Sequence, residues 1–173
     1  MNKKIIFFDG DGTLWYPKNT KRSKRPDWIY SKNTKSKKYL PLLTLTPSIA
    51  KVLLTLKRKG KILIALSTHP HSLKEADEHM NSKIKHLKIE HLFDSILTAR
   101  PHPLGKGNAI LNFLKKSKIP KSQALLIGDS YLYDYRSAKS VGVDCLLIKT
   151  PYMSPKGRRV KKTITNLSVL SKL

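Results

Sequence analysis

The sequence predicts an α/β protein with a three-layer, Rossmann-like fold, in which helices cover both faces of a central, mainly parallel five-stranded sheet. Two observations support this prediction. Short apolar runs alternate along the chain with longer segments of helical character, which is the order of βαβ units. The runs are nearly continuous in hydrophobicity, as is typical of strands buried on both faces of a parallel sheet. They lie at residues 5–9, 61–67, 94–99, 123–129 and 144–150.

The segments between these runs have the features of helices. Thr46 is a candidate N-cap for the first, and Gly60 follows it as a stop signal. The second carries its acids early and its lysines late, which suits the helix dipole. The third repeats apolar residues at helical spacing, and the fourth closes on a glycine. The four predicted helices lie within residues 46–60, 71–87, 105–119 and 131–142.

The connection after the first strand breaks this alternation. Residues 14–45 have no clear period and combine basic and aromatic residues with scattered Pro, Ser, Thr and Asn. Aromatic residues such as Trp15 and Trp28 argue against a purely disordered linker. We therefore expect a small, at least partly ordered basic flap at residues 14–45. We expect residues 1–173 to form one domain, with a basic C-terminal tail at 151–173.

The charge of the chain is its most unusual bulk property. Lysine and arginine number 35 against 11 acids, which gives a formal net charge of +24. Such a field attracts phosphates, nucleic acid and anionic membrane surfaces, although a general lysine bias produces the same composition. No apolar run is long enough to span a bilayer, so we expect no membrane insertion and a cytoplasmic protein. The single cysteine, Cys145, lies in an apolar run and is predicted to be a buried, inert thiol.

Several of the scarce acids lie where predicted strands end. The stretch "IIFFDGDGTLWYP" runs from an apolar strand straight into Asp9 and Asp11. Asp129 ends the fourth predicted strand, and Asp134 follows five residues later. In an open parallel sheet, ligands bind at the carboxyl ends of the strands. Carboxylates gathered there repel one another unless a cation holds them, and hard oxygen ligands favour Mg²⁺.

A metal beside these carboxylates would suit phosphoryl chemistry. It neutralises part of the charge of a phosphate, so Asp9 can attack phosphorus and form an aspartyl-phosphate. Asp11 is placed to protonate the leaving oxygen and later to activate water. Ser67 and Thr68, at the end of the second strand, are candidate phosphate-binding residues. Lys106, at the start of the helix after the third strand, is a candidate fixed positive charge.

Each feature also has a simpler structural interpretation. Asp-Gly-Asp-Gly alone can form a turn or part of a calcium loop, although an EF-hand needs a glutamate in a zone that is basic here. Asp129 can be a helix N-cap, and the Ser67–Thr68 pair can cap a helix as well. Lys106 is one lysine among many. His69 is retained only as a possible substrate contact, because it follows Ser67 and Thr68 directly.

Four short motifs together resemble those of the haloacid dehalogenase superfamily. "DGDGT" resembles its first motif, Asp-x-Asp-x-Thr, and "ILIALS" resembles its second, an apolar strand that ends in Ser or Thr. Lys106 lies where the third motif has a lysine, and "GDSYLYD" resembles the fourth. The motifs occur in order from residue 5 to about residue 150, so the resemblance covers most of the chain.

The resemblance implies the Rossmann-like fold, Mg²⁺, Asp9 as nucleophile and Asp11 as acid/base. It also implies metal ligation by Asp9, the backbone carbonyl of Asp11 and Asp129, with Asp134 in support. The interval from Ser67 to Lys106 holds no large cap, so the chain is similar to nearly capless members. "DGDGTLWYP" is similar to the capless magnesium-dependent phosphatase branch.

We therefore expect a Mg²⁺-dependent phosphomonoester hydrolase with an open site. Its substrate class remains open among small phosphomonoesters, phosphoproteins such as phosphotyrosine proteins, and others. One alternative is a nucleic-acid end phosphatase that binds its substrate through the basic flap. Another is a basic nucleic-acid-binding module on an inactive scaffold.

Overall fold

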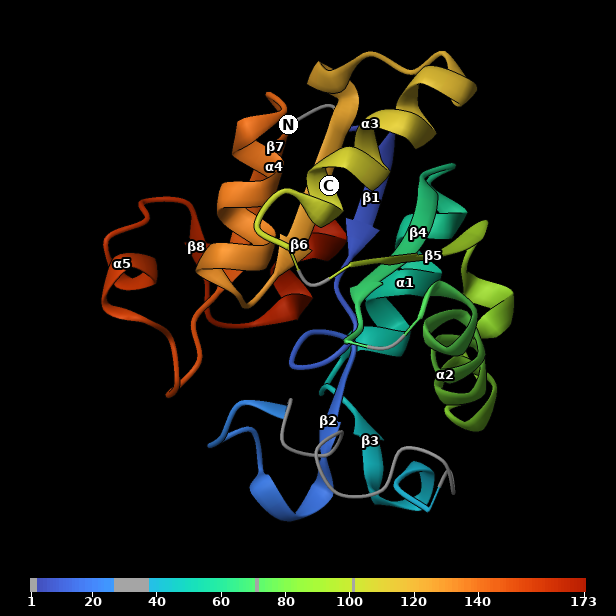
Figure 1. Cartoon of the computed structure of the whole chain (residues 1–173), viewed down its shortest axis with the longest axis vertical. Coiled ribbons are helices and arrows are strands. Elements are labelled where there is room, and N and C mark those ends of the chain that lie inside the picture. The colour runs from blue at the N-terminus through green and yellow to red at the C-terminus, as the bar shows by residue number, and fades with distance from the viewer. Residues whose placement is uncertain (1–2, 27–37, 71, 101) are drawn as a thin grey trace.

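A parallel six-stranded sheet forms the centre of the computed structural model, which describes residues 3–26, 38–70, 72–100 and 102–173 (Figure 1). The strand order is β5-β4-β1-β6-β7-β8, and every neighbouring pair is parallel. The predicted parallel α/β fold is confirmed, and its five strands are joined by a sixth, the two-residue β8. The strands are β1 (Ile5–Phe8), β4 (Ile62–Thr68), β5 (Ser95–Ala99), β6 (Ala124–Gly128), β7 (Asp144–Ile148) and β8 (Thr163–Ile164).

Helices cover both faces of the sheet, because alternate side chains of each strand point to opposite sides. Ile6 and Phe8 of β1 belong to one core cluster, with residues of α1 (Ile49–Arg58) and α2 (Leu73–His86). Ile5 and Phe7 belong to the other, with residues of α3 (Gly105–Ser117) and α4 (Ser137–Ser140). These two cores make the three layers that the sequence predicts. Short 3₁₀ turns, η4 (Glu90–Leu92) and η5 (Lys121–Gln123), precede β5 and β6.

Strand β1 lies at the point where the chain reverses its direction across the sheet. From β1 the chain passes to β4 and β5 on one side, and then to β6, β7 and β8 on the other. In register, Phe8 is level with Ala65 of β4 and Ile127 of β6. The residues that follow these three strands therefore meet at one edge of the sheet, which is where open α/β sheets bind ligands.

The first helix begins later than its candidate cap predicts. Thr46 is not the N-cap, because α1 begins at Ile49 and Ser48 occupies the cap position with φ 68°. The Thr46 amide instead donates to the Leu14 carbonyl at 2.9 Å, which extends the pairing of the preceding hairpin. Backbone pairing with a distant segment, which local spacing does not encode, therefore delays the start of the helix.

Described parts of the predicted flap pack on the core. Strands β2 (Trp15–Pro17) and β3 (Leu43–Leu45) pair antiparallel, and the 3₁₀ turns η1 (Lys18–Thr20) and η3 (Leu40–Leu42) flank the loop between them. The side chains of Trp15 and Leu43 are buried in the core cluster that contains α1. Residues 27–37 of the predicted flap, Trp28 among them, lie outside the described residues.

The predicted C-terminal tail also contains ordered elements. It forms α5 (Pro155–Arg158), β8 and the 3₁₀ segment η7 (Leu167–Lys172). Leu167 and Leu170 are buried in the core cluster that contains α1, so this segment closes one face of the sheet. Cys145 of β7 is buried as predicted, and burial raises the pKa of its thiol. Within the described chain, no helix combines the length and apolarity that crossing a bilayer requires.

Candidate active site

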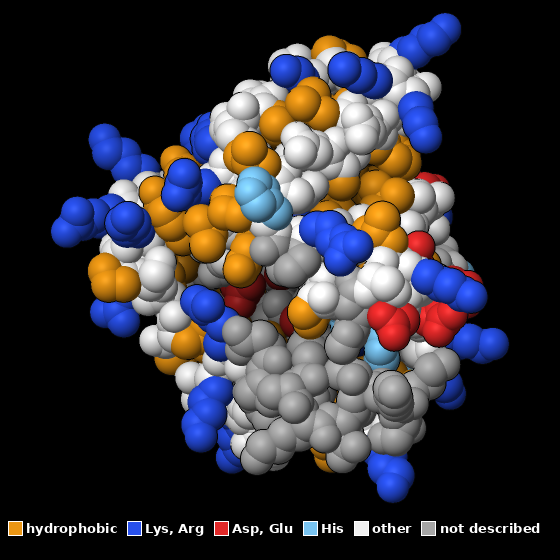
Figure 2. Space-filling view, in the orientation of Figure 1, with side chains coloured by type: hydrophobic (Ala, Val, Ile, Leu, Met, Phe, Trp, Pro, Cys, Tyr) orange, Lys and Arg blue, Asp and Glu red, His pale blue; other side chains and the backbone are white. Residues whose placement is uncertain are grey.

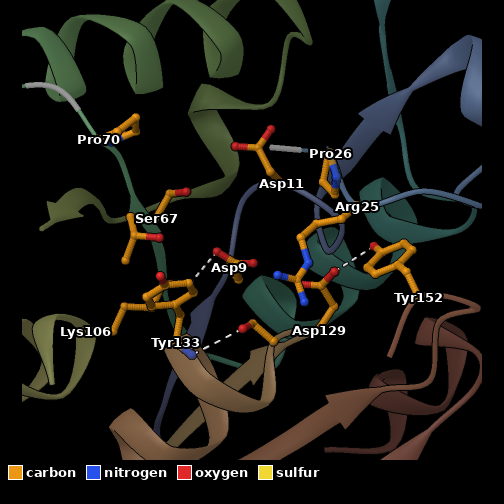
Figure 3. A pocket seen from close by; sticks show the side chains of 12 residues that line it. Asp9, Asp11, Arg25, Pro26, Ser67, Pro70, Lys106, Asp129, Tyr133 and Tyr152 are labelled. Atoms are coloured by element: carbon orange, nitrogen blue, oxygen red, sulfur yellow. Dashed lines mark hydrogen bonds and ion pairs between the residues drawn. The ribbon is translucent and has the colours of Figure 1, made fainter. Parts of the chain in front are cut away.

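A pocket of about 260 Å³ opens at the edge of the sheet where β1, β4 and β6 end (Figure 3). Its walls contain six of the seven site residues predicted from the sequence, namely Asp9, Asp11, Ser67, Thr68, Lys106 and Asp129. The seventh, Asp134, is fully buried and contacts Lys106. The other lining residues, which were not among the predicted site residues, are Arg25, Pro26, Pro70, Ser130, Tyr133 and Tyr152.

Lys106 connects two of the predicted carboxylates inside the protein. Its Nζ atom is ion-paired with Oδ1 of Asp9 and with Oδ1 of Asp134, and the lysine is only 1% exposed. Burial alone lowers the pKa of the Lys106 ammonium, but the nearby Asp134 and Asp9 outweigh it and raise the pKa. Lys106 is therefore a fixed positive charge at neutral pH, and it occupies the place that the third-motif resemblance implies.

Asp134 is positioned by a local departure from α-helical geometry. Residues Tyr131–Arg136 form the π-helical segment η6 rather than the start of a regular helix. The Ser130 amide donates to Asp134 Oδ2 at 2.8 Å, and this leaves Oδ1 for Lys106. A Cβ on Gly128 would overlap the Asp134 side chain, so the glycine permits the close approach. Single π turns often occur at functional sites.

The carboxylates of Asp9, Asp129 and Asp134 form a cluster that fits a divalent cation. One oxygen from each lies within 4.8 Å of the others, and all three residues are buried. Burial and the neighbouring Asp134 raise the pKa of Asp9 well above its ordinary value and that of Asp129 to about 6. No described residue donates a hydrogen bond to Asp9 Oδ2 or Asp129 Oδ1. These two hard oxygen atoms are therefore available to a cation, and Mg²⁺ is the ion that such ligands favour.

The raised pKa of Asp129 predicts how the metal-free protein responds to pH. Its ordinary pKa is 3.8 and its folded value is about 6, so between these values the folded state keeps a proton that the unfolded state loses. We expect the stability that Asp129 contributes to fall as the pH rises from about 4 to about 6. Asp129→Asn, which cannot titrate, is the reference.

Thermal unfolding of both proteins in a chelator, followed by circular dichroism, measures the effect. The melting temperature of the wild type relative to Asp129→Asn should fall over this interval, because only the wild type gains a buried charge. Addition of Mg²⁺ should raise the melting temperature of the wild type most above pH 6, because a bound ion stabilises the folded state by mass action. A relative melting temperature that rises with pH in the chelator would contradict the assignment.

Asp11 is held by two buried side chains that come from different parts of the chain. Lys83 Nζ donates to Asp11 Oδ2 at 2.8 Å, and Trp15 Nε1 donates to Asp11 Oδ1 at 2.8 Å. Lys83 is 1% exposed, and its ammonium lies 5.7 Å from the centre of the Trp15 ring. Burial lowers the pKa of Lys83, and Asp11 opposes that shift. Lys83 was not predicted as a site residue. Its spacing from Met80 and Ile84, however, places it on the buried face of α2, and a lysine on such a face indicates a buried charged partner.

Gly12 brings the first loop against Asp129. Its φ is +87°, and a Cβ at this position would overlap Asp129 Oδ2 and lie 2.7 Å from Tyr152 Oη. The Tyr152 hydroxyl donates to Asp129 Oδ2 at 2.6 Å, so a side chain on Gly12 would disturb this pair. Gly60 has a similar φ of +72°, but a Cβ there meets nothing within 4 Å. A side chain would therefore strain the backbone at both glycines, but it would also overlap neighbouring atoms only at Gly12.

We expect Gly12→Ala to destabilise the protein more than Gly60→Ala does. Both substitutions place an L side chain at positive φ, which costs roughly 1–2 kcal/mol. Only Gly12→Ala must also move Asp129 or Tyr152, and overpacking adds about 1–3 kcal/mol. Urea unfolding of the two variants measures the difference. Equal losses would show that Asp129 and Tyr152 do not restrict this position.

Not every predicted contact is found at the pocket. His69, retained from the sequence as a substrate contact, does not line it. The His69 ring is 4% exposed and stacks on His79 at 4.8 Å between centroids, because it packs toward α2. Ser67 and Thr68, which precede it at the end of β4, do line the pocket.

The predicted basic flap contributes residues to the lining of the pocket. Arg25 and Pro26 line it, and Arg22 donates to the Gly12 carbonyl at 3.2 Å. Figure 3 shows the Arg25 side chain directed toward Asp129, whose pKa this positive charge lowers against the larger effect of burial. Two aromatic side chains that line the pocket, Tyr133 and Tyr152, belong to segments that follow β6 in the chain. Tyr133 lies within the fourth motif, whereas no feature of the sequence pointed to Tyr152.

The chain is similar to known proteins both in a family-wide sequence pattern and in its fold. The family model described as haloacid dehalogenase-like hydrolase matches residues 8–148. No curated protein gave a significant match to the sequence. Three similar solved structures are each below 20% identical to this chain, so they bear on the fold alone.

All three similar structures match over nearly their whole length. A proposed phosphoglycolate phosphatase from Lactobacillus delbrueckii has a TM-score of 0.72 at 15% identity, covering 99% of this chain and 98% of its own. A haloacid dehalogenase-like family hydrolase from Streptococcus pneumoniae has a TM-score of 0.69 at 19% identity, with coverages of 99% and 98%. A proposed beta-phosphoglucomutase from Thermotoga maritima has a TM-score of 0.70 at 16% identity, with coverages of 98% and 97%.

Proposed function

Since the chain belongs to the haloacid dehalogenase-like hydrolases, we propose that it is a Mg²⁺-dependent phosphomonoester hydrolase. The observation that carries this proposal is the buried group at the end of β1. There Lys106 is ion-paired with both Asp9 and Asp134, and Asp129 completes a cluster of cation ligands. A fixed positive charge beside a carboxylate nucleophile and a set of metal ligands suits phosphoryl transfer.

The proposed metal would be held by Asp9 and Asp129, with Asp134 in support and the Asp11 carbonyl as a backbone ligand. When bound, it supplies positive charge that neutralises the phosphoryl oxygens and lets an anionic nucleophile approach. Ser67, which lines the same pocket as Asp9, would donate a hydrogen bond to those oxygens.

The proposed reaction proceeds in two displacements at phosphorus. Asp11, whose two oxygens accept hydrogen bonds from Lys83 and Trp15, must first take up a proton from solvent. The Asp9 carboxylate then attacks the phosphorus atom, the ester P–O bond breaks, and the Asp11 carboxyl gives that proton to the leaving oxygen. Asp11, now ionised, then takes a proton from water, and that water attacks the aspartyl-phosphate. The acyl phosphate bond to Asp9 breaks, and inorganic phosphate leaves.

Lys83 would keep Asp11 in place for the proton transfer. We expect Lys83→Met to lower kcat/KM about 10-fold or more for an alkyl phosphate, and much less for p-nitrophenyl phosphate. The reason is that p-nitrophenolate leaves without protonation, whereas an alkoxide does not. For this two-step reaction, kcat/KM covers only the steps up to the phosphoenzyme, so the later hydrolysis does not obscure the comparison.

Lys83→Arg, which keeps the positive charge, is the conservative variant for this prediction and should restore part of the alkyl phosphate activity. Circular dichroism must show that both variants are folded. Equal losses on the two substrates would indicate that Lys83 acts only on stability.

The site is proposed to be open to substrates of more than one size. Between β4 and α3 the described chain forms only α2, η4 and β5, so this interval contributes no separate cap domain. The pocket itself combines the guanidinium of Arg25 with the aromatic side chains of Tyr133 and Tyr152. This lining suits a small phosphomonoester that carries a second anionic group or a ring.

A substrate screen tests the proposal. The panel consists of p-nitrophenyl phosphate, phosphoglycolate, sugar phosphates, nucleotides, phosphotyrosine and phosphorylated oligonucleotide ends, each with Mg²⁺ and with a chelator. We expect phosphate release that depends on Mg²⁺. Failure to hydrolyse any member of the panel in Mg²⁺ would overturn the proposal.

Nucleic-acid end phosphatase activity is the second candidate function. It is favoured by the position of Arg25, a residue of the basic flap that lines the pocket. Preference for phosphorylated oligonucleotide ends over small phosphates, lost in Arg25→Ser, would support it.

A further inference from the structure

A second hollow lies outside the catalytic pocket, on the flank of the molecule formed by α4 and α5. This C-terminal groove has a volume of about 590 Å³. Its walls come from η6 and α4 on one side and from α5 and the segment after it on the other. The residues that matter here are Tyr131, Tyr135, Lys156, Arg159, Lys161 and Lys162. Figure 2 shows Lys and Arg side chains (blue) on this flank with hydrophobic side chains (orange, a class that includes tyrosine) between them.

The groove is strongly positive, and little of its charge is neutralised. Asp144 lies next to it and is ion-paired with Lys3 at 2.7 Å, Lys139 at 3.2 Å and Lys162 at 3.5 Å. By contrast, Lys156, Arg159 and Lys161 have no carboxylate within 4.0 Å in the part of the chain that the structure describes. Three unpaired, exposed cations therefore lie within residues 156–161, where their positive charge attracts polyanions.

Two aromatic rings lie beside these cations. Tyr131 and Tyr135 are one turn apart on η6, with ring centroids 5.7 Å apart and planes 22° from parallel. Both side chains are half-buried, so each is held by the core and still lines the groove. Preoriented rings beside a basic track are the features with which proteins hold single-stranded nucleic acid, since bases stack on the rings while the cations contact phosphates.

Other anionic partners fit the groove less well. Binding to an anionic membrane requires apolar side chains that enter the lipid, but the aliphatic lining of the groove is limited to Val160. A duplex presents its bases stacked on one another, so it cannot use the tyrosine rings. Of these partners, only a single-stranded nucleic acid can place its phosphates against the cations and stack its unpaired bases on the tyrosine rings.

We propose that the C-terminal groove is a binding site for single-stranded nucleic acid. The groove is distinct from the catalytic pocket, but η6 contributes to both. Tyr133 of η6 lines the pocket, whereas Tyr131 and Tyr135 line the groove. The proposal does not depend on phosphatase activity. The two are therefore tested by separate measurements.

The test uses fluorescence anisotropy of a fluorescein-labelled single-stranded 12-mer that carries no terminal phosphate. The triple variant Lys156→Glu, Arg159→Glu, Lys161→Glu should bind it at least about 10-fold more weakly than the wild type at low salt. The slope of log K against log salt should fall by about 2, because roughly three phosphate contacts are lost. Hydrolysis of p-nitrophenyl phosphate should remain unchanged, since none of these residues lines the catalytic pocket.

A second triple variant, Lys51→Glu, Lys85→Glu, Lys116→Glu, is the matched control. It makes the same charge change at exposed lysines on α1, α2 and α3, and none of the three has a carboxylate partner in the described chain. It should weaken binding by less than about threefold. Equal losses in the two triples would overturn the proposal, because they would show attraction by net charge alone.

Stacking is tested with Tyr131→Leu, which keeps an apolar side chain against the core. It should weaken binding of the 12-mer about fivefold or more, while circular dichroism confirms the fold. Unchanged affinity, or a preference for the duplex of the same sequence, would overturn the proposal. So would binding to phosphatidylserine vesicles without binding to the 12-mer.

Discussion

Asp9→Asn is expected to lower Mg²⁺-dependent phosphatase activity by at least about 1,000-fold while the protein remains folded. The amide has nearly the shape of the carboxylate but no anionic oxygen that can attack phosphorus. Asp9 is buried, and Asp134 and Asp129 oppose its negative charge. The neutral amide relieves that repulsion, which offsets the loss of one of the two ion pairs of Lys106.

Phosphate release from p-nitrophenyl phosphate and thermal unfolding by circular dichroism measure the two parts of this expectation. Glu78→Gln is the control, because it removes one negative charge from an exposed position on α2. It should leave both activity and melting temperature unchanged. Retained activity in Asp9→Asn would exclude Asp9 as the nucleophile, even if the rest of the site is correct.

Lys106→Met should have the largest effect on stability. The substitution leaves Asp9 and Asp134 buried without their shared cation, and removal of one partner from a buried ion pair costs about 3–5 kcal/mol. The loss should be smaller at pH 5 than at pH 7, because the carboxylate of Asp9, whose pKa is already raised, can then take up a proton. Phosphatase activity should also be lost, since the fixed charge beside the nucleophile is gone.

Urea unfolding at pH 7 and pH 5 checks this prediction. Lys115→Met, at an exposed position of the same helix, provides the comparison and should change the free energy of unfolding by less than about 0.5 kcal/mol. If Lys106→Met costs no more than Lys115→Met, the buried ion-pair group does not hold the site together.

Local sequence patterns determined the sheet and the part of the site that is built on it. Continuous apolar runs identified five of the six strands, and β8 escaped because two residues are too few to give a pattern. Asp9 follows β1 directly and Asp129 follows β6 directly, so their meeting at one edge was predictable once the sheet was parallel. Lys106 was named from its place at the start of the helix after the third strand, and the order of the motifs supported that choice.

The rest of the site is decided by long-range packing. Lys83 is one of many basic residues, and only the docking of α2 on the sheet brings it to Asp11 at 2.8 Å. Tyr152 reaches Asp129 from a loop beyond β7, and no local spacing encodes that contact. His69 illustrates the converse, because it follows the second motif directly but turns to stack on His79.

The sequence by itself therefore determined the parallel sheet, the edge of the sheet at which the pocket lies, and the presence of Asp9, Asp11 and Asp129 in its lining. Periodicity and strand-end position are local properties, and a few neighbouring residues are enough to encode them. Only the tertiary structure decided which carboxylates Lys83 and Lys106 pair with, and which lysines remain exposed along the C-terminal groove. Burial depends on contacts between segments far apart in the chain, and in a chain with 35 basic residues composition cannot distinguish them.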